Sequence, residues 1–247
     1  YYMKILAVQS RMGIGDTVIF LPFIKALSQK FNSPISILVK ENSKADQYLQ
    51  QTKYIDKILT LERDNKTNNR HGGFFGIFNL ANDLKKYKFD KIFIFNSSLR
   101  FNLIAKISGI PQIYQYPLFT KNKQHIIEAP KKFLKENLDL DVNEDPEIQI
   151  DNDSISKVEQ KFQIDKNITN ILLGIGGSGA TKRIPAKTFL SVIDKISNIK
   201  NCRFFLATGK ANEEREILNE ILQSKFKSFC TRLDNLTISE ILPLIKI

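Results

Sequence analysis

The segment GIGD at 13–16 carries two glycines and an aspartate between an apolar run, KILAV (4–8), and a longer periodic run. The periodic run predicts a helix from about Asp16 to Phe31. A glycine turn lets the backbone approach a ligand closely, and a helix N-terminus stabilises negative charge. Asp16 is therefore either the plain N-cap of this helix or a carboxylate that performs chemistry at its start.

A dinucleotide-binding turn is a further reading of the same glycines. The spacing of Gly13 and Gly15 fits that turn, but Val18 stands where a third glycine is expected. The acidic residue expected about 20 positions further on is offered only weakly, by Glu41. Asp16 would also repel a pyrophosphate, so the segment disfavours binding of NAD.

A second glycine-rich segment, GGSGATKR at 176–183, lies between an apolar run and a helical pattern. Its backbone N–H groups, including that of Gly179, are suited to a phosphate group. Two hydroxyls and a cation complete the set: Ser178, Thr181 and Lys182. The loop is not a P-loop, because the lysine does not directly follow the last glycine. The alternative is a flexible turn with a surface lysine.

Two groups of acidic residues have plain structural readings. Glu213 and Glu214 fall in the first turn of a helix predicted over 212–223, where acids favour the helix dipole. The alternative is that Glu213 contacts a ribose or sugar hydroxyl. Asp139 and Asp141 match the D-x-D pattern of divalent-metal sites, but they lie in an acidic stretch and are expected to be solvated.

Neither zinc binding nor nucleophilic catalysis has support in the sequence. His71 and His125 lack companions at ligand spacing, and no G-x-S-x-G or Cys-His signature occurs. Cys202 and Cys230 have apolar surroundings, which predicts buried thiols of a reduced cytoplasmic protein.

The net charge is +11, from 37 basic and 26 acidic residues, which favours polyanionic partners. Nucleic acid is the weakest of these, because the basic residues are dispersed and no RNP-like motif occurs. An anionic membrane surface or a phosphorylated substrate fits better. No run approaches membrane-spanning length and no signal peptide opens the chain, so we expect a soluble protein.

Apolar runs that predict strands alternate with helical patterns along the chain. Strands are predicted at 4–8, 35–39, 55–61, 91–95, 112–116 (an edge strand), 170–176, 203–208 and 226–230. Helices are predicted near 16–31, 43–51, 75–87, 99–108, 126–137, from Pro185, over 212–223 and from Ser239. The alternation indicates an α/β protein of βαβ units in parallel sheets with helices on both faces. We expect two Rossmann-like domains, 1–140 and 169–247, joined by a linker at 141–168, with the second domain incomplete.

These segments together resemble the bacterial heptosyltransferases of lipopolysaccharide biosynthesis, glycosyltransferase family 9. The family's opening is similar to MKILAVQSRMGIGDTVIFLPFIKAL (3–27), and its mid-domain segment is similar to SSLRFNLIAKISGI (97–110). Its second-domain opening looks like GIGGSGATKRIPAKTFLSVIDKI (174–196).

The resemblance implies a GT-B fold, in which two Rossmann-like domains face each other across a cleft that holds the active site. It implies inverting sugar transfer without a metal or other cofactor. The donor is a nucleotide sugar such as ADP-heptose, and it binds the C-terminal domain. The acceptor is a phosphorylated lipid–oligosaccharide of the lipopolysaccharide core. The implied protein is a cytoplasmic monomer in peripheral contact with the anionic inner membrane.

The resemblance also implies roles for individual residues. Asp16 becomes the general base that takes the proton of the acceptor hydroxyl, since an aspartate is ionised at neutral pH. The donor diphosphate is held by Ser178, Gly179, Thr181 and Lys182, and Glu213 contacts the nucleotide or sugar. The acceptor side contains Gly13, Gly15, Ser98 and Arg100.

Two departures from the family pattern limit these expectations. Ile184 stands where the family commonly has tryptophan, which leaves the sugar open. The family's D-[TS]-G-x-x-H motif is expected soon after residue 247, so we expect the 247-residue chain alone to be weakly active or inactive. The competing hypotheses are a nucleotide-dependent oxidoreductase or epimerase and a non-catalytic nucleotide- or polyanion-binding module.

Overall fold

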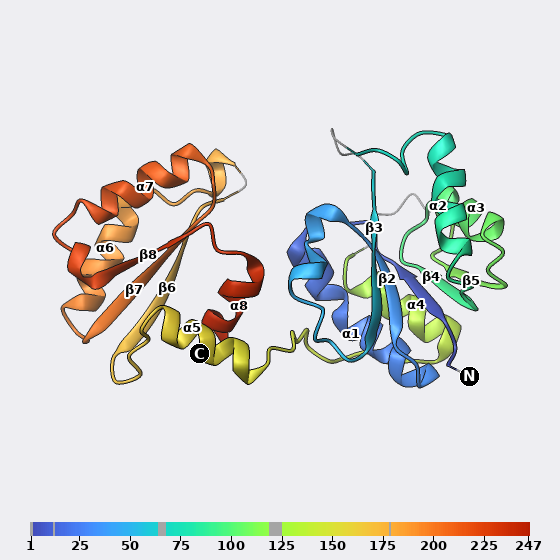
Figure 1. The fold of residues 1–247 in the computed structure, drawn as a ribbon, viewed down its shortest axis with the longest axis horizontal. Helices are drawn as coiled ribbons and strands as arrows, with labels where there is room; N and C mark the ends of the chain where they lie inside the picture. Colours follow the sequence, from blue (N-terminus) through green and yellow to red (C-terminus); the bar gives the residue numbers. More distant parts are fainter. Residues whose placement is uncertain (1, 12, 64–67, 119–124, 178) are drawn as a thin grey trace. The chain divides into compact units, whose positions relative to one another are not determined.

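The computed structural model describes residues 2–11, 13–63, 68–118, 125–177 and 179–247. The chain divides into two compact units, of which the first ends at Gln149 and the second begins at Ile150 (Figure 1). This boundary lies within the stretch predicted as a linker, 141–168. Residues 139–151 form no helix or strand, whereas Asn152–Lys161 is a helix of the second unit.

The first unit alternates strands and helices as the sequence predicts. Its strands are β1 (Ile5–Val8), β2 (Ile35–Lys40), β3 (Ile55–Leu61), β4 (Lys91–Ile94) and β5 (Gln112–Gln115). Its helices are α1 (Ile14–Phe31), α2 (Phe75–Lys85), α3 (Leu99–Ile107) and α4 (Glu128–Leu138).

These strands form one parallel sheet in the order β3-β2-β1-β4-β5. β1 lies at its centre, with Val8 opposite Leu38 of β2 and opposite Ile94 of β4. The predicted parallel sheet is confirmed, and so is the edge position of the strand predicted at 112–116.

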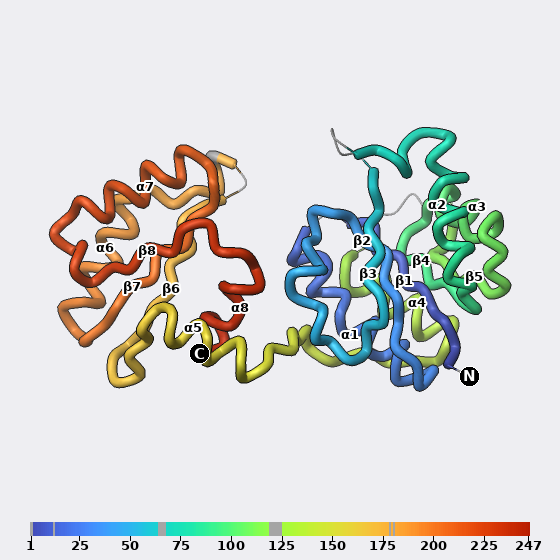
Figure 2. The backbone as a smooth tube through the Cα atoms, in the orientation of Figure 1, coloured from blue at the N-terminus to red at the C-terminus, as the bar shows by residue number. Residues whose placement is uncertain are grey.

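Helices cover both faces of this sheet. Leu80 of α2 and Ile104 of α3 are buried in a core cluster with strand residues of one face, and α2 and α3 run side by side (Figure 2). On the other face, the ring of Phe93 in β4 packs against Phe31 of α1 and Phe133 of α4, with centroid separations of 5.9 and 6.4 Å. Because β1, β2 and β4 are buried on both sides, they read as nearly continuous apolar runs.

The second unit contains a parallel sheet of β6 (Thr169–Ile175), β7 (Cys202–Thr208) and β8 (Cys230–Asp234), in the order β6-β7-β8. Its helices are α5 (Asn152–Lys161), α6 (Ala186–Ser197), α7 (Asn212–Leu222) and α8 (Ile238–Lys246).

Two helices close the core of the second unit. Phe189 and Ile193 of α6 and Leu218 of α7 pack on Phe204 of β7. On the opposite face, Phe205 and other residues of the sheet, the segment after α5 and the end of α8 line a cavity of about 550 Å³.

Two predicted elements differ in the structure, and one helix was not predicted. The helix predicted near 43–51 is replaced by two 3₁₀ helices, Glu41–Ser43 and Ala45–Gln47, because Lys44 between them has φ of +48°. The segment Asn152–Lys161 was not predicted as a helix because it is polar, although Asp151 caps it by accepting a hydrogen bond from Ser154 N–H at 2.7 Å.

The strand predicted at 226–230 is wrong in position. Phe226 is buried, Lys227–Phe229 is a 3₁₀ helix, and β8 begins only at Cys230. Among the described residues, β8 pairs with β7 alone, and Leu233 is its one buried side chain. Its sequence, CTRLD, therefore lacks the apolar run of a central strand. No helix within the described residues is long and apolar enough to cross a lipid bilayer.

Candidate functional site

The sheet order places a candidate site at the carboxyl ends of β1 and β4. The chain builds β2 and β3 on one side of β1 and then returns to build β4 and β5 on the other side. Open parallel sheets bind ligands at the carboxyl ends of the strands where the winding reverses. The loops that leave these two strands carry GIGD (13–16) and residues 96–98. The topology therefore brings Gly13, Asp16 and Ser98 to the same edge of the sheet.

Asp16 lies inside the first turn of α1 and is not its N-cap. The helix begins at Ile14, and Gly13 is the cap residue. The Oδ2 oxygen of Asp16 accepts a hydrogen bond from Gly13 N–H at 3.1 Å, and Thr17 Oγ1 donates to Gly13 O at 3.1 Å. The carboxylate is half-exposed. An ionised carboxylate has about four acceptor positions, so this one bond fixes its orientation and leaves it able to accept a proton.

Gly15 is exposed in the same turn, and a Cβ added there would meet nothing within 4 Å. Packing therefore does not require glycine at this position. Its absent side chain leaves the backbone beside Asp16 open to a ligand.

Asn96 is a site residue that sequence reasoning missed. It follows β4 after Phe95, and its Nδ2 donates to Ser10 Oγ at 3.0 Å, which ties the loop after β4 to the loop after β1. Its Oδ1 accepts from Ser98 N–H at 3.0 Å. Ser98, expected on the acceptor side, is thus held at this edge as the N-cap residue of α3. The sequence does indicate Asn96, because it is the first polar residue after the apolar run that predicts a strand at 91–95.

Two buried polar atoms at the same edge have no hydrogen-bond partner within the described part of the chain. They are Nε2 of Gln9, which follows β1, and the hydroxyl of Tyr116, which follows β5. Burial raises the pKa of the Tyr116 phenol well above its usual range, and the charge of Arg11 partly opposes this shift. Unpaired buried polar atoms are rare, so the Gln9 amide is a candidate donor to a ligand.

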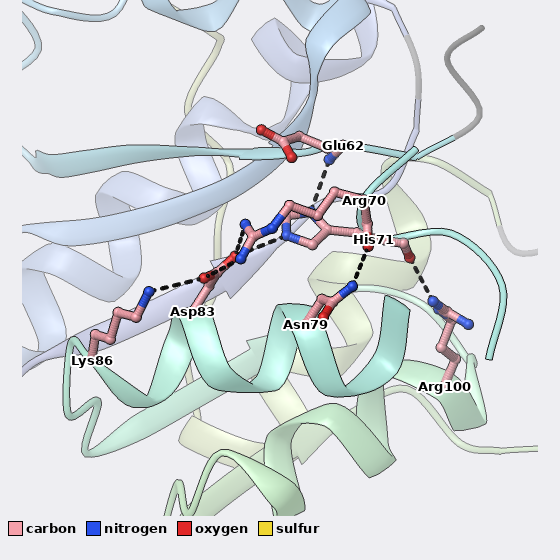
Figure 3. Close-up of polar contacts among 7 residues, drawn as sticks. All are labelled: Glu62, Arg70, His71, Asn79, Asp83, Lys86 and Arg100. Atoms are coloured by element: carbon pink, nitrogen blue, oxygen red, sulfur yellow. Dashed lines mark hydrogen bonds and ion pairs between the residues drawn. The ribbon is translucent and has the colours of Figure 1, made fainter. Parts of the chain in front are cut away.

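A charged network lies on α2 and the turn before it (Figure 3). Both carboxylate oxygens of Asp83 accept from the guanidinium of Arg70, one of them at 2.9 Å, and Lys86 donates at 3.3 Å. The pKa of Asp83 is held well below its usual range, chiefly by the hydrogen bond from Arg70. Hydrogen bonds from His71 and Lys86 lower it further. His71 Nδ1 accepts from Glu62 N–H at 3.0 Å and its Nε2 lies 3.0 Å from Asp83 Oδ2, which assigns the proton to Nε2. Both ring nitrogens are engaged, so His71 has a structural role.

Arg100 is also part of this region (Figure 3). Its guanidinium donates to His71 O at 2.5 Å and to Gly73 O at 2.7 Å. Asn79 of α2 donates to Arg70 O at 2.9 Å. Arg100, which was expected on the acceptor side, therefore binds the backbone of the turn at 71–73. This turn is far from the GIGD segment in the sequence.

In the second unit, the glycine-rich loop follows β6 as expected. Ser178, one of the predicted phosphate ligands, lies outside the described residues. Gly179 has φ of +154°, which favours glycine, and a 3₁₀ helix at Ala180–Lys182 follows it. Thr181 and Lys182 are exposed. α6 begins only at Ala186, so these side chains lie on a turn before the helix and not at its N-terminus.

Glu214 links the loops that follow β6 and β7. Its Oε1 accepts from Gly177 N–H at 3.3 Å and its Oε2 accepts from Gly209 N–H at 2.9 Å. The amide of Gly177 is thus engaged within the protein. Glu213, the residue singled out from sequence, is more exposed, and its Oε1 lies 3.7 Å from Nη1 of Arg183. Both glutamates do lie in the first turn of α7.

The remaining candidates have local roles. Asp139 and Asp141 both pair with Lys135 Nζ, at 2.8 and 2.7 Å. Cys202 and Cys230 are free thiols, and burial raises the pKa of Cys230 to about 11, which keeps its thiol protonated at neutral pH. Over the described ranges, no three His, Cys, Asp or Glu side chains gather as they would around a metal ion.

Comparison with known proteins identifies a family and a shared fold. A model of glycosyltransferase family 9 (heptosyltransferase) matches residues 77–246. The solved structure of ADP-heptose lipopolysaccharide heptosyltransferase II from E. coli is similar with a TM-score of 0.70 at 16% identity, over 98% of this chain and 76% of that chain. A family 9 glycosyl transferase from Veillonella parvula gives a TM-score of 0.72 at 18% identity, over 94% and 70% of the two chains.

A UDP-GlcNAc 2-epimerase from Neisseria meningitidis gives a TM-score of 0.51 at 18% identity, over 99% of this chain and 74% of that chain. At such identities these structural matches show a shared fold. No curated protein sequence matches the chain significantly.

Proposed function

Because the chain belongs to glycosyltransferase family 9, the heptosyltransferase family, and is a glycosyltransferase with a GT-B-like fold, we propose the reaction that it catalyses. It transfers a heptose, or a related sugar, from a nucleoside diphosphate donor to a hydroxyl of a lipopolysaccharide core acceptor. The donor is ADP-heptose, the sugar nucleotide in the name of the similar E. coli enzyme. The transfer inverts the anomeric configuration and uses no metal ion.

Asp16 is the general base of this reaction. The observation that carries the proposal is its position: a half-exposed carboxylate, fixed by Gly13 N–H at 3.1 Å, at the carboxyl end of the central strand. The acceptor hydroxyl gives its proton to this carboxylate while its oxygen attacks the anomeric carbon. The bond from that carbon to the donor diphosphate breaks at the same time, so the diphosphate leaves with its electron pair and the configuration inverts.

Lys182 stabilises the departing diphosphate. The ammonium group supplies the positive charge that a metal ion provides in other transferases, and Thr181 and the N–H of Gly179 add hydrogen-bond donors. Ser178 completes this group by its place in the sequence. Since the N–H of Gly177 is bound by Glu214 at 3.3 Å, the lysine carries more of this role than the loop amides.

Glu213 binds the nucleotide or sugar. Its carboxylate is exposed, and an acceptor-only group suits the vicinal hydroxyls of a ribose or hexose. On the acceptor side, Gly13 and Gly15 leave backbone space and Ser98 offers a hydroxyl, whereas Arg100 acts indirectly by holding the turn at 71–73. The protein works as a cytoplasmic monomer in peripheral contact with the inner membrane, without a bound cofactor and without nucleic acid.

The competing functions have weaker support. Likeness to the UDP-GlcNAc 2-epimerase reflects a fold that many enzymes share. The family model, in contrast, covers most of this chain. A non-catalytic binding module is also less favoured, because the family whose model matches this chain is a glycosyltransferase family.

The test is to incubate the natural full-length protein with ADP-heptose and a lipid A–inner core acceptor and to measure ADP release with and without EDTA. We expect release that depends on the acceptor, is unchanged by EDTA, and yields a product of inverted configuration by NMR. Loss of activity in EDTA or retained configuration would contradict the mechanism. A C2-epimerised product from UDP-GlcNAc, with no transfer from ADP-heptose, would favour the epimerase reading.

A further inference from the structure

The first unit exposes an apolar surface on α2 and α3. Its side chains project from the start of α2 and along one side of α3: Phe74, Phe75, Phe78, Leu99, Leu103 and Ile107. Phe75 is 79% and Phe74 is 69% exposed. These six are among the fifteen large apolar side chains that are exposed in the described residues. We refer to them as the α2/α3 apolar surface.

The phenylalanines of this surface contact one another at the start of α2. The ring of Phe74 lies 6.0 Å from that of Phe75 and 5.7 Å from that of Phe78, both edge-on. On α3, residues four positions apart repeat along one side of the helix. α2 and α3 pack side by side (Figure 2). A cluster of exposed apolar side chains on adjacent elements marks an interaction surface.

Hydrogen bonds from α2 and α3 hold the backbone of the turn before Phe74 (Figure 3). Arg100 of α3 binds the carbonyls of His71 and Gly73, and Asn79 of α2 binds that of Arg70. Because both helices follow strands of one parallel sheet, their N-termini lie at the edge that carries Asp16. The exposed rings are therefore presented at the candidate acceptor edge of the unit.

The charges of this region favour an anionic partner. Residues 70–85 and 99–107 contain four basic side chains, Arg70, Lys85, Arg100 and Lys106, and only one acidic side chain, Asp83. Arg70 and Asp83 neutralise each other as an ion pair. The excess positive charge therefore comes from Arg100 and from Lys85 and Lys106 in the last turns of the two helices. A surface that combines exposed aromatic rings with excess positive charge attracts anionic lipid and buries its rings at the headgroup boundary.

We propose that the α2/α3 apolar surface docks on an anionic phospholipid bilayer, with Phe74 and Phe75 entering the headgroup region. Docking in this way turns the edge that carries Asp16 and Ser98 toward lipid-linked molecules. The proposal rests on the peripheral membrane contact proposed above and names the residues that make it. Its test concerns lipid binding alone, so the result does not depend on the transfer reaction.

A second copy of the chain fits this surface less well. Stable protein interfaces use about 20–30 residues on each side, whereas this surface offers six. Two copies meeting here would also bring the same excess of positive charge together.

The test is sedimentation of the full chain with vesicles of phosphatidylethanolamine and phosphatidylglycerol, compared with vesicles of phosphatidylcholine. The variant is the double substitution Phe74→Ser and Phe75→Ser. The matched control is Ile199→Ser, which removes another exposed apolar side chain, 77% exposed, from the second unit. No sugar donor or acceptor is present, so the outcome is independent of the proposed reaction.

We expect the wild type and Ile199→Ser to bind the anionic vesicles equally and to bind phosphatidylcholine weakly. The double variant should bind the anionic vesicles at least about tenfold more weakly, with an unchanged melting temperature because both rings are exposed. Equal binding by the double variant, or equal loss in Ile199→Ser, would overturn the proposal. Loss of a dimer in the double variant, without a change in vesicle binding, would assign the surface to a second copy.

Discussion

The backbone N–H of Gly13 donates a hydrogen bond to Oδ2 of Asp16 at 3.1 Å. This contact joins two roles that the sequence presents as alternatives, because the carboxylate stabilises the first turn of α1 and is held in place by it. An asparagine at this position keeps an oxygen that accepts from Gly13 N–H, but its amide cannot take a proton from a substrate hydroxyl. The structural and chemical roles of Asp16 can therefore be separated by mutation.

Lys182 is predicted to act on the donor. Lys182→Ala should lower kcat/KM for ADP-heptose by about 100-fold, because an ammonium group facing the leaving diphosphate is lost. The control is Lys187→Ala, which removes an exposed lysine from α6 in the same unit. Equal effects of the two substitutions would show that general positive charge, and not the position of Lys182, supports the reaction.

Gln9 is predicted to contact the acceptor through its unpartnered Nε2. Gln9→Met removes the amide at similar volume and should raise the acceptor KM several-fold, with little change in the KM for ADP-heptose. Thr52→Val is the control, since Thr52 Oγ1 is also buried without a partner in the described residues. An unchanged acceptor KM in Gln9→Met would exclude the contact.

Asp83 is predicted to make the stability of the first unit depend on pH. Its pKa is lowered in the folded state, so the folded protein favours the ionised carboxylate. The stabilisation is present above the ordinary aspartate pKa of about 4, and it is lost as the pH falls from there toward the folded-state value. Asp83→Asn should lower the free energy of unfolding at pH 7 by about 2 kcal/mol and flatten its dependence on acid pH.

Denaturant unfolding between neutral and acid pH measures this effect. Asp153→Asn serves as the control, because Asp153 pairs with Lys157 on an exposed helix face at 2.6 Å and exposed pairs contribute little. If Asp83→Asn and wild type lose stability in parallel below pH 4, another group is responsible.

Gly76 is predicted to be required by packing. A Cβ at this position would lie 2.2 Å from the backbone carbon of His71. Gly76→Ala should therefore displace the turn at 71–73 and destabilise the protein by about 1–3 kcal/mol. Gly15→Ala, where a Cβ meets nothing within 4 Å, should leave stability unchanged or raise it by up to about 1 kcal/mol. A melting temperature for Gly76→Ala equal to that of the wild type would refute this.

The sequence predicts the parallel sheets well because their central strands are buried on both faces and are therefore continuously apolar. β8 was misplaced because it buries Leu233 alone and its composition is polar. α1 starts two residues before the predicted position, since glycine at the cap gives a weaker signal than the aspartate three residues later.

Contacts between distant residues account for what sequence reasoning missed at the site. Glu214 and Gly177 are 37 positions apart, and no local pattern joins them. Asn96 and Ser10 are 86 apart and meet only because β1 and β4 are neighbours in the sheet. Arg100 was assigned from sequence to the acceptor, and only its hydrogen bonds to His71 and Gly73 reveal its structural partners.

The central claim, that Asp16 is the base of a sugar transfer, is tested most directly by single-turnover kinetics of Asp16→Asn in the natural full-length protein, with ADP-heptose and the core acceptor in EDTA. The control is Asp46→Asn, an exposed acid in the same unit. We predict a rate about 10²–10⁴-fold lower for Asp16→Asn, unchanged donor binding and melting temperature, and a normal rate for Asp46→Asn. A rate for Asp16→Asn within about threefold of wild type, well short of the loss of a general base, would contradict the account.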